Sequence, residues 1–163
     1  MNNIGNKKHL EIERKFLVTN DSFIQEAYSC LHIKQGYLSL EPNKTVRVRI
    51  SGDRGFLTIK GKRSSNGLSR YEWEQEIDID DANEMMALCG EEVIDKRRYL
   101  VDYHEHIFEV DVFEGDNKGL VVAEIELSEE EEHFDRPQWL GVEVSHDKRY
   151  HNSRLIQYPY STW

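Results

Sequence analysis

Alternation of apolar and charged residues is the feature that most constrains the fold of this chain. In residues 9–18, HLEIERKFLV, it places Glu11, Glu13 and Lys15 on one side of an extended strand and Ile12 and Phe16 on the other, because successive side chains of a strand point to opposite faces. Further strands are predicted over residues 33–40, 45–50, 56–62, 70–79, 95–101, 108–113 and 121–127. The sequence therefore predicts eight β-strands.

The charged faces of these strands carry an unusual composition. Solvent-facing strand positions usually mix Thr, Ser, Gln and Lys, whereas nearly every position here is ionisable, with Arg and Lys on some strands and Glu and Asp on others. The acids are Glu11, Glu13, Glu72, Glu74, Glu76, Glu109, Asp111, Glu124 and Glu126. The bases are Lys15, Arg47, Arg49, Lys60, Lys62, Lys96 and Arg98. For any single strand, a solvated outer face remains the alternative, because one-sided alternation is the default in antiparallel sheets.

About eight antiparallel strands can close into a barrel whose interior is filled by side chains or holds one small ligand. Charged faces that point inward require a hydrated channel, because unpaired buried charge is costly. The apolar faces, with Ile12, Val48, Trp73 and Ile125, then need covering helices. We therefore expect an α+β fold: a closed eight-stranded antiparallel β-barrel, or tunnel, with a charged interior and helices packed outside.

Four helices are expected from capping residues and periodicity. One covers residues 20–31; a second begins at Asp80 or Asp81 and stops at Gly90; a short acidic one covers residues 128–134; and the tail holds a fourth, ended by Pro159. His104 and His106 are expected at a hairpin turn. The length of 163 residues predicts a single domain, residues 1–163.

Charge and composition exclude several classes of function. The chain holds 21 Lys and Arg against 31 Asp and Glu, a formal net charge of −10, so it has no diffuse attraction for nucleic acid or an anionic membrane. Cys30 and Cys89 lack metal-ligand spacing. With no signal-peptide or membrane-spanning pattern, we expect a cytoplasmic protein without nucleic-acid or membrane partners.

The charged faces themselves indicate a chemistry. Clustered carboxylates suit a hard divalent cation such as Mg²⁺ or Mn²⁺, with Ca²⁺ as a further option. Clustered Arg and Lys suit phosphate oxygens, Arg as a bidentate fork and Lys as a point charge. Both sets in one interior predict a polyphosphate that is bound together with its metal.

In order along the chain, the charged motifs resemble those of the CYTH superfamily, the triphosphate tunnel metalloenzymes. The resemblance spans roughly residues 9–157. Its elements are E-x-E-x-K (Glu11, Glu13, Lys15), R-x-R (Arg47, Arg49), T-x-K (Thr58, Lys60), G-x-x-R-x-E-x-E (Gly67, Arg70, Glu72, Glu74), K-x-R (Lys96, Arg98), EVDVF (Glu109, Asp111), E-x-E (Glu124, Glu126) and DKRYHN (Lys148).

The resemblance implies an eight-stranded tunnel that binds a linear triphosphate with divalent metal, and it implies a role for each matching residue. The implied metal ligands are Glu11, Glu13, Asp111, Glu124 and Glu126. The implied phosphate-binding residues are Arg47, Arg49, Lys60, Lys96, Arg98 and Lys148. Lys15 would lie beside the terminal phosphoryl group, and Glu72 and Glu74 would orient water, bind a second metal or pair with bases.

Within this superfamily, the stretch KQGYL (34–38) looks most like that of short bacterial inorganic triphosphatases. We therefore expect a metal-dependent hydrolase of a small-molecule linear triphosphate, most simply inorganic tripolyphosphate. The alternatives are a class IV-type adenylyl cyclase, a thiamine or nucleoside triphosphatase, and a non-catalytic polyphosphate-binding module. A homodimer is left open.

Overall fold

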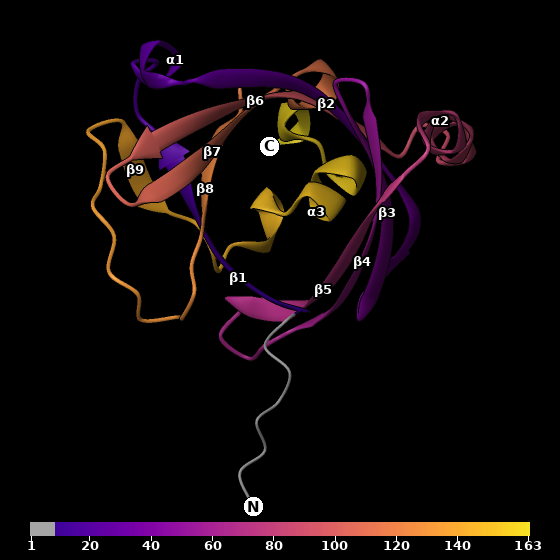
Figure 1. Ribbon diagram of the computed structural model, residues 1–163, viewed down its shortest axis with the longest axis horizontal. Helices are drawn as coiled ribbons and strands as arrows, with labels where there is room; N and C mark the ends of the chain where they lie inside the picture. The colour runs from indigo at the N-terminus through magenta and orange to yellow at the C-terminus, as the bar shows by residue number, and fades with distance from the viewer. Residues whose placement is uncertain (1–8) are drawn as a thin grey trace, which may run out of the picture.

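Eight antiparallel strands close into a barrel in the computed structural model, which describes residues 9–163 (Figure 1). The barrel strands are β1 (Leu10–Val18), β2 (Ser29–Glu41), β3 (Lys44–Ser51), β4 (Arg54–Arg63), β5 (Ser69–Ile77), β6 (Val93–Tyr103), β7 (His106–Phe113) and β8 (Val121–Glu126). They follow the order β5-β4-β3-β2-β6-β7-β8-β1, and pairing of β1 with β5 closes the ring. A short strand, β9 (Leu140–Glu143), extends the sheet from β1. The predicted fold class is confirmed.

Helices and short 3₁₀ segments connect or cover the strands. The helices are α1 (Phe23–Glu26), α2 (Ile79–Leu88) and α3 (Asn152–Gln157), and the 3₁₀ segments are η2 (Gly115–Asn117), η3 (Lys148–Tyr150) and η4 (Tyr160–Thr162). In residues 9–163, no helix has the length and apolar character needed to cross a membrane. The predicted domain, residues 1–163, includes residues 1–8, which lie outside the described residues.

The second and fourth predicted helices are confirmed, as α2 and α3. The side chain of Asp78, two residues before the expected start, accepts a hydrogen bond from the backbone N–H of Asp80 and caps α2. Gly90 follows the helix with a φ of 60°, a conformation that glycine adopts without strain. The hairpin turn expected at His104 and His106 joins β6 to β7.

The predicted helix over residues 20–31 is wrong for most of its length. Only Phe23–Glu26 is helical, and β2 already begins at Ser29. Cys30 pairs with Tyr99 of β6 in the barrel ladder. Backbone pairing with a neighbouring strand therefore overrides the local helical preference of this segment.

The predicted acidic helix over residues 128–134 is also wrong, because this segment forms turns. The carboxylate of Glu132 accepts a hydrogen bond from Ser128 Oγ at 2.7 Å and lies 2.9 Å from His106 Nε2. Two residues later, Phe134 is buried against Phe16 and Phe108. Anchoring at both points holds the acidic run against the barrel wall in place of a helix.

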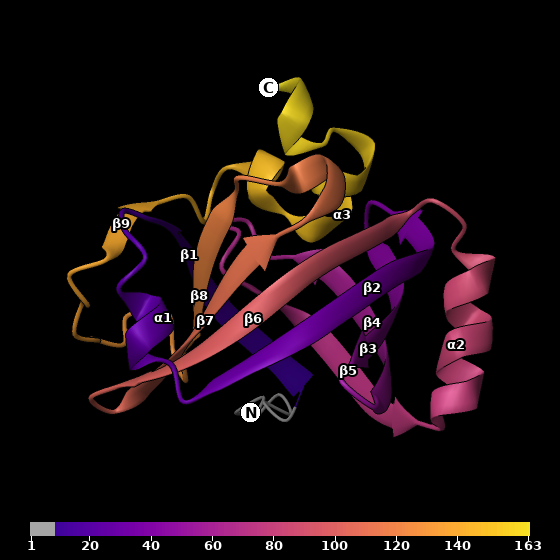
Figure 2. The same ribbon diagram turned by 90° about the horizontal axis from the view of Figure 1, so that it is seen from above.

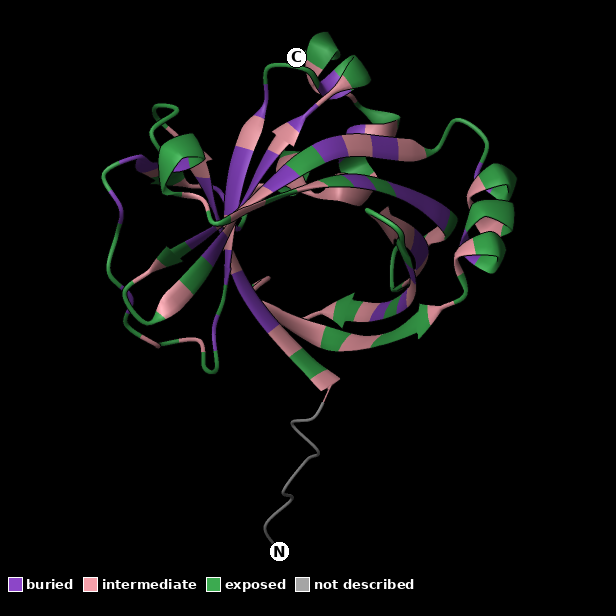
Figure 3. Cartoon of the chain, turned by 45° about the horizontal axis from the view of Figure 1, so that its top comes forward, coloured by how far each residue is buried: buried purple, intermediate pink, exposed green. Residues whose placement is uncertain are grey.

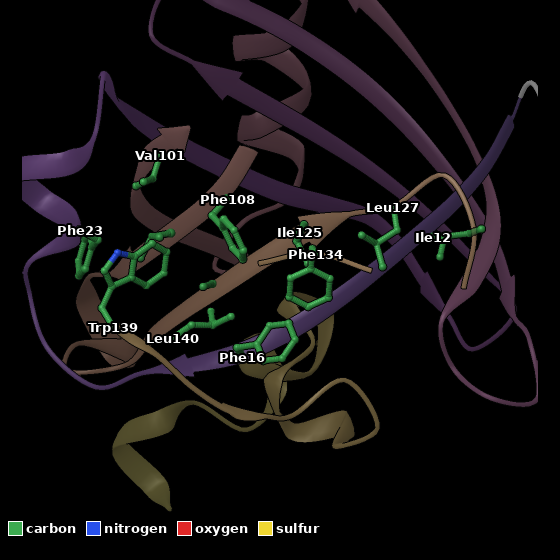
Figure 4. Packing of buried hydrophobic residues seen from close by; sticks show 12 residues of the cluster. Ile12, Phe16, Phe23, Val101, Phe108, Ile125, Leu127, Phe134, Trp139 and Leu140 are labelled. Atoms are coloured by element: carbon green, nitrogen blue, oxygen red, sulfur yellow. The ribbon is translucent and has the colours of Figure 1, made fainter. Parts of the chain in front are cut away.

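The largest apolar cluster lies outside the barrel wall, on the face of β1, β7 and β8 that points away from the charges. Phe16, Phe108, Phe134 and Trp139 pack there with Phe23 of α1 (Figure 4). Strands consequently show alternating bands of buried and exposed residues (Figure 3). Of the residues expected on the covered face, Ile12, Val48 and Ile125 are buried, whereas Trp73 on β5 is only half-buried.

Helix α2 covers the outer face of β2, β3 and β4 at two glycines. A Cβ atom on Gly36 would lie 2.6 Å from Cys89 Sγ, and one on Gly55 would lie 2.5 Å from the Cβ of Ala82. Both approaches are too close for any side chain, so the glycines allow the helix to rest on the sheet backbone.

The C-terminal segment lies across one end of the barrel, whereas α1 and α2 flank its wall (Figures 1 and 2). Leu155 of α3 is fully buried against Ile94, Phe113 and Val122, which belong to β6, β7 and β8. This packing brings the start of α3 to the barrel interior, and we call this end the closed end.

Candidate functional site

The barrel encloses a cavity of about 180 Å³ to which all eight barrel strands contribute side chains. Its acidic lining residues are Glu11, Glu13, Glu72, Glu74, Glu109, Glu124 and Glu126. Its basic lining residues are Lys15, Arg47, Arg49, Lys60, Arg63, Arg70 and Arg98. Most of the charged strand faces thus point inward, although the predicted Lys62 and Glu76 do not line the cavity, and the alternative of a solvated outer surface is excluded.

Cross-strand ion pairs connect the acids and the bases of this interior. Lys15 lies opposite Glu124 in the β1–β8 ladder, with Nζ 2.5 Å from Oε1. Lys60 of β4 lies between Glu11 of β1, at 2.8 Å, and Glu72 of β5, at 2.7 Å. The register of the strands therefore decides which charges meet, and it places both signs along the length of the cavity.

Carboxylates crowd one another where β1, β5 and β8 meet. Burial raises the pKa of Glu11 to about 7, and the neighbouring carboxylate of Glu13 adds to this effect. Burial also raises the pKa of Glu126, as do the charges of Glu72 and Glu109. Among residues 9–163, Glu126 has no hydrogen bond or ion pair with a base. This part of the cavity therefore has an excess of negative charge that a cation would neutralise.

Positive charge is in excess beside Arg47 and Arg49 on β3. Burial lowers the pKa of Arg49, and the adjacent Arg47 lowers it further. Arg49 donates to Glu74 at 3.0 Å and Arg47 to Thr58 Oγ1 at 3.3 Å, yet the Nε atom of each arginine is buried without a hydrogen-bond partner. Two guanidinium groups with unused donors have the chemistry that suits an oxyanion.

Lys96 and Asp111, two of the predicted site residues, do not line the cavity. Both are fully buried, and Lys96 Nζ lies 2.6 Å from Asp111 Oδ2. Arg98 donates two further hydrogen bonds to the same carboxylate, at 2.7 and 2.8 Å, and forms an ion pair with Glu109. The lone pairs of Asp111 are thus already engaged by two cations in the barrel wall, and only Arg98 reaches the cavity.

Lys148, the remaining predicted phosphate-binding residue, also lies outside the barrel interior. It belongs to η3 and lines a second cavity at the closed end. The other predicted site residues, from Glu11, Glu13 and Lys15 to Glu124 and Glu126, all line the barrel cavity.

Several lining residues were not assigned a role from the sequence. Arg63 donates to Glu13 at 3.1 Å and Arg70 to Glu11 at 3.2 Å. A register shift between Lys60 and Arg63 turns Arg63 inward, where simple alternation would have placed Lys62. Tyr37, Thr45, Ile125 and the closed-end residues His151, Asn152 and Ser153 complete the lining. Arg70, Tyr37, His151 and Asn152 stood within recognised motifs without an assigned role, whereas Arg63 and Ser153 stood in none.

The chemistry of the carboxylate cluster fits a divalent metal. Glutamate oxygens are the donors that Mg²⁺ and Mn²⁺ prefer, and Glu126 is a carboxylate without a base partner in the described part of the chain. In residues 9–163, no three acidic, His or Cys side chains already stand at metal-ligand spacing. Ligation would therefore require carboxylates such as Glu11 and Glu13 to exchange their lysine and arginine partners for the metal.

Comparison with known proteins agrees with this geometry. The chain is 46% identical over 154 residues to an inorganic triphosphatase of Acetivibrio thermocellus, covering 94% of this chain and 97% of the relative. It is 36% identical over 149 residues to an inorganic triphosphatase of Nitrosomonas europaea, covering 89% and 95%. The crystal structure of the inorganic triphosphatase NE1496 superimposes with a TM-score of 0.64 and 31% identity, covering 90% of this chain and 93% of that one.

The profile of the CYTH domain matches residues 9–155, which include every barrel strand and the whole charged lining. Together with the two relatives, this match identifies the family: the chain belongs to the CYTH domain family.

Proposed function

We propose that this protein is a metal-dependent hydrolase of linear triphosphates, with inorganic tripolyphosphate as its substrate. The observation that carries the proposal is the narrow cavity in which unpartnered guanidinium donors on β3 face carboxylates with an excess of negative charge. The names of the two relatives and of the structural neighbour support the same substrate.

The bases of the cavity would bind and orient the substrate. Arg47 and Arg49 would donate hydrogen bonds to phosphate oxygens through their unused Nε atoms, and Lys60 and Arg98 would add positive charge. Phosphoryl transfer depends mainly on positioning and on neutralising charge at the transferred group. Lys15, buried between Glu13 and Glu124, would lie beside the terminal phosphoryl group and stabilise its charge.

The carboxylates would hold the metal and the attacking water. CYTH triphosphatases are generally metal-dependent, and a bound divalent cation neutralises phosphate charge and activates water. Here Glu11, Glu13, Glu124 and Glu126 would hold Mg²⁺ or Mn²⁺, with Ca²⁺ as a further option, while Glu72 and Glu74 orient water. The water oxygen bonds to the terminal phosphorus, the bridging P–O bond breaks, and orthophosphate and pyrophosphate result.

The alternatives need features that the cavity lacks. A cyclase or a thiamine triphosphatase must hold a large ring beside the triphosphate, and Tyr37 is the only phenol, phenyl or indole ring among the lining residues of the described chain. A non-catalytic module would need the phosphate-binding bases, but a lone carboxylate such as Glu126 would only weaken anion binding unless metal is present.

The test offers tripolyphosphate, ATP and thiamine triphosphate to the purified chain with Mg²⁺, Mn²⁺ or Ca²⁺. Orthophosphate, pyrophosphate and cyclic AMP are measured separately. We expect orthophosphate and pyrophosphate in equal amounts from tripolyphosphate, and none after chelation of the metal. Cyclic AMP as the main product from ATP would overturn the proposal, as would tight binding of tripolyphosphate without turnover under any of the three metals.

A further inference from the structure

A second and larger cavity lies at the closed end of the barrel, and we call it the closed-end cavity. Its volume is about 910 Å³, within the usual range of about 300–1,000 Å³ for small-molecule sites. The β2–β3 turn, the loop between β4 and β5, and the segment from Ser145 to Gln157 form its walls. Its ionisable lining residues are Glu41, Lys62, Arg63, Arg70, His146, Lys148, His151 and Arg154.

Inside the barrel, carboxylates pair with the bases, whereas several bases of the closed-end cavity have no carboxylate partner within the part of the chain that the structure describes. In residues 9–163, Lys62, Lys148 and Arg154 form no ion pair with a carboxylate. Among the described residues that line this cavity, Glu41 is the only one with a carboxylate, and it forms an ion pair with Lys44 at 3.3 Å. In a chain of net charge −10, this cavity is a local site of excess positive charge, which attracts anions.

The two cavities adjoin one another. Arg63, Arg70 and His151 line both of them, together with Thr45 and Ser153. The Nε2 atom of His151 is buried without a hydrogen-bond partner. A buried polar atom without a partner is costly, so a ligand oxygen or an ordered water at the junction would satisfy it.

The lining also indicates the class of ligand. Leu40 and Pro42 are its only large apolar residues, and among the described lining residues there is no Phe, Tyr or Trp ring on which a nucleobase would stack. Ammonium and guanidinium groups, with hydroxyl and amide groups from Ser64, Ser65 and Asn66, suit the oxygens of a small, multiply charged anion.

We propose that the closed-end cavity is a second oxyanion site, separate from the triphosphate position, that binds inorganic orthophosphate or pyrophosphate. Both ions are products of the proposed reaction, and to that extent the inference rests on the proposed function. Because Arg63, Arg70 and His151 line both cavities, a product formed in the barrel would arise beside this site.

The test is calorimetric titration of orthophosphate and of pyrophosphate, each without metal or triphosphate. The double variant Lys62→Ala/Arg154→Ala removes two cations from the closed-end cavity. The control Lys34→Ala/Lys118→Ala removes two exposed lysines that do not line it, so the net charge of the two proteins is equal. We expect at least tenfold weaker binding in the first variant and unchanged binding in the control. Equal binding, or an equal loss, in the two variants would overturn the proposal.

Two further variants keep this test decisive. Because the Arg154 guanidinium stacks 3.9 Å above the Tyr158 ring, its loss affects the C-terminal segment; Lys62→Glu, on β4, should weaken binding without that effect. Arg47→Ala/Arg49→Ala removes barrel donors and should leave the binding that depends on Lys62 and Arg154 unchanged; loss of that binding in this variant would assign the anion to the barrel and overturn the proposal. The titration needs no turnover, so phosphate binding in a chain that hydrolyses no tripolyphosphate would refute only the proposed function.

Discussion

Lys96 and Asp111 form an ion pair that is sealed from solvent: Nζ lies 2.6 Å from Oδ2, and both side chains are 0% exposed. Burial lowers the pKa of Lys96 to about 8, against the opposing effect of Asp111. Burial also opposes ionisation of Asp111, but Arg98 and Lys96 hold the pKa of Asp111 well below its usual range. One carboxylate therefore compensates two cations in the barrel wall.

Removal of this carboxylate should unfold the barrel more easily. Asp111→Ala leaves Lys96 and Arg98 without their shared partner, and breaking a buried pair in this way costs about 3–5 kcal/mol. Urea denaturation measures the loss, with Asp53→Ala, at the exposed β3–β4 turn, as the control. A variant with undiminished stability and no metal-dependent activity would instead support Asp111 as a metal ligand.

Arg49 should behave in the opposite way. Its pKa is lowered by burial and by Arg47, so the folded chain without ligand disfavours its charge. Arg49→Ala should leave the ligand-free melting temperature nearly unchanged or raise it. The gain in melting temperature from tripolyphosphate with Mg²⁺ should shrink sharply, because a ligand stabilises by RT ln(1 + [L]/Kd).

The matched control for this arginine is Arg97→Ala, which breaks an exposed pair with Glu114 and should preserve the gain. Arg49→Ala could instead lower the melting temperature strongly without ligand and keep the full increase on addition of tripolyphosphate with Mg²⁺. That result would make Arg49 a structural partner of Glu74 and not a ligand contact.

The contrast between Lys96 and Arg49 shows how far the sequence determines this site. Arg49 alternates with the apolar residues Val48 and Ile50, whereas Lys96 stands between Asp95 and Arg97, and both lie on the inward face of their strands. Which of them reaches open space depends on how far along the barrel each lies and on which carboxylate stands opposite. The strand register sets both the position of each residue along the barrel and the carboxylate opposite it. The alternation of residues along a strand does not reveal this register.

The bulge in β4 and the short helix α1 illustrate two further limits of prediction from the sequence. One inserted residue between Lys60 and Arg63 exchanges the inward and outward faces, and Gly61, a residue type that often marks a bulge, is the one signal of its place in the sequence. Residues 20–31 look helical by local propensity, but Ser29 and Cys30 pair with β6. Eight strands, the inward charged faces and α2 followed from periodicity and capping, because those signals are local.

Glu126 provides the sharpest test of the metal assignment. In residues 9–163 it has no base partner, and its pKa is raised by burial and by Glu72 and Glu109. Glu126→Gln keeps the shape and removes a hard anionic ligand. We expect at least a tenfold higher Mg²⁺ requirement for turnover, with unchanged or slightly increased ligand-free stability. Glu129→Gln, on the exposed acidic turn, is the control, and an unaltered Mg²⁺ requirement at Glu126 would contradict the assignment.

The last prediction concerns the pH dependence that Glu11 confers. Burial, followed by repulsion from Glu13, raises the pKa of Glu11 from 4.5 to about 7. Between these values the folded chain holds a proton that the unfolded chain has lost, so this group's contribution to stability falls as the pH rises from about 4.5 through about 7, by at most about 1.4 kcal/mol per pH unit. His151 acts in the opposite direction: burial and Arg63 lower its pKa from 6.5 to about 3, so its contribution to stability rises between those pH values.

The test is therefore the difference in unfolding free energy between the original chain and Glu11→Gln, measured by urea denaturation with a chelator present. As the pH rises from about 5 to about 8, Glu11→Gln should gain stability relative to the original chain. The contribution of His151 is present in both proteins and cancels in this difference. Parallel curves for the two proteins would show that Glu11 keeps an ordinary pKa in the folded barrel.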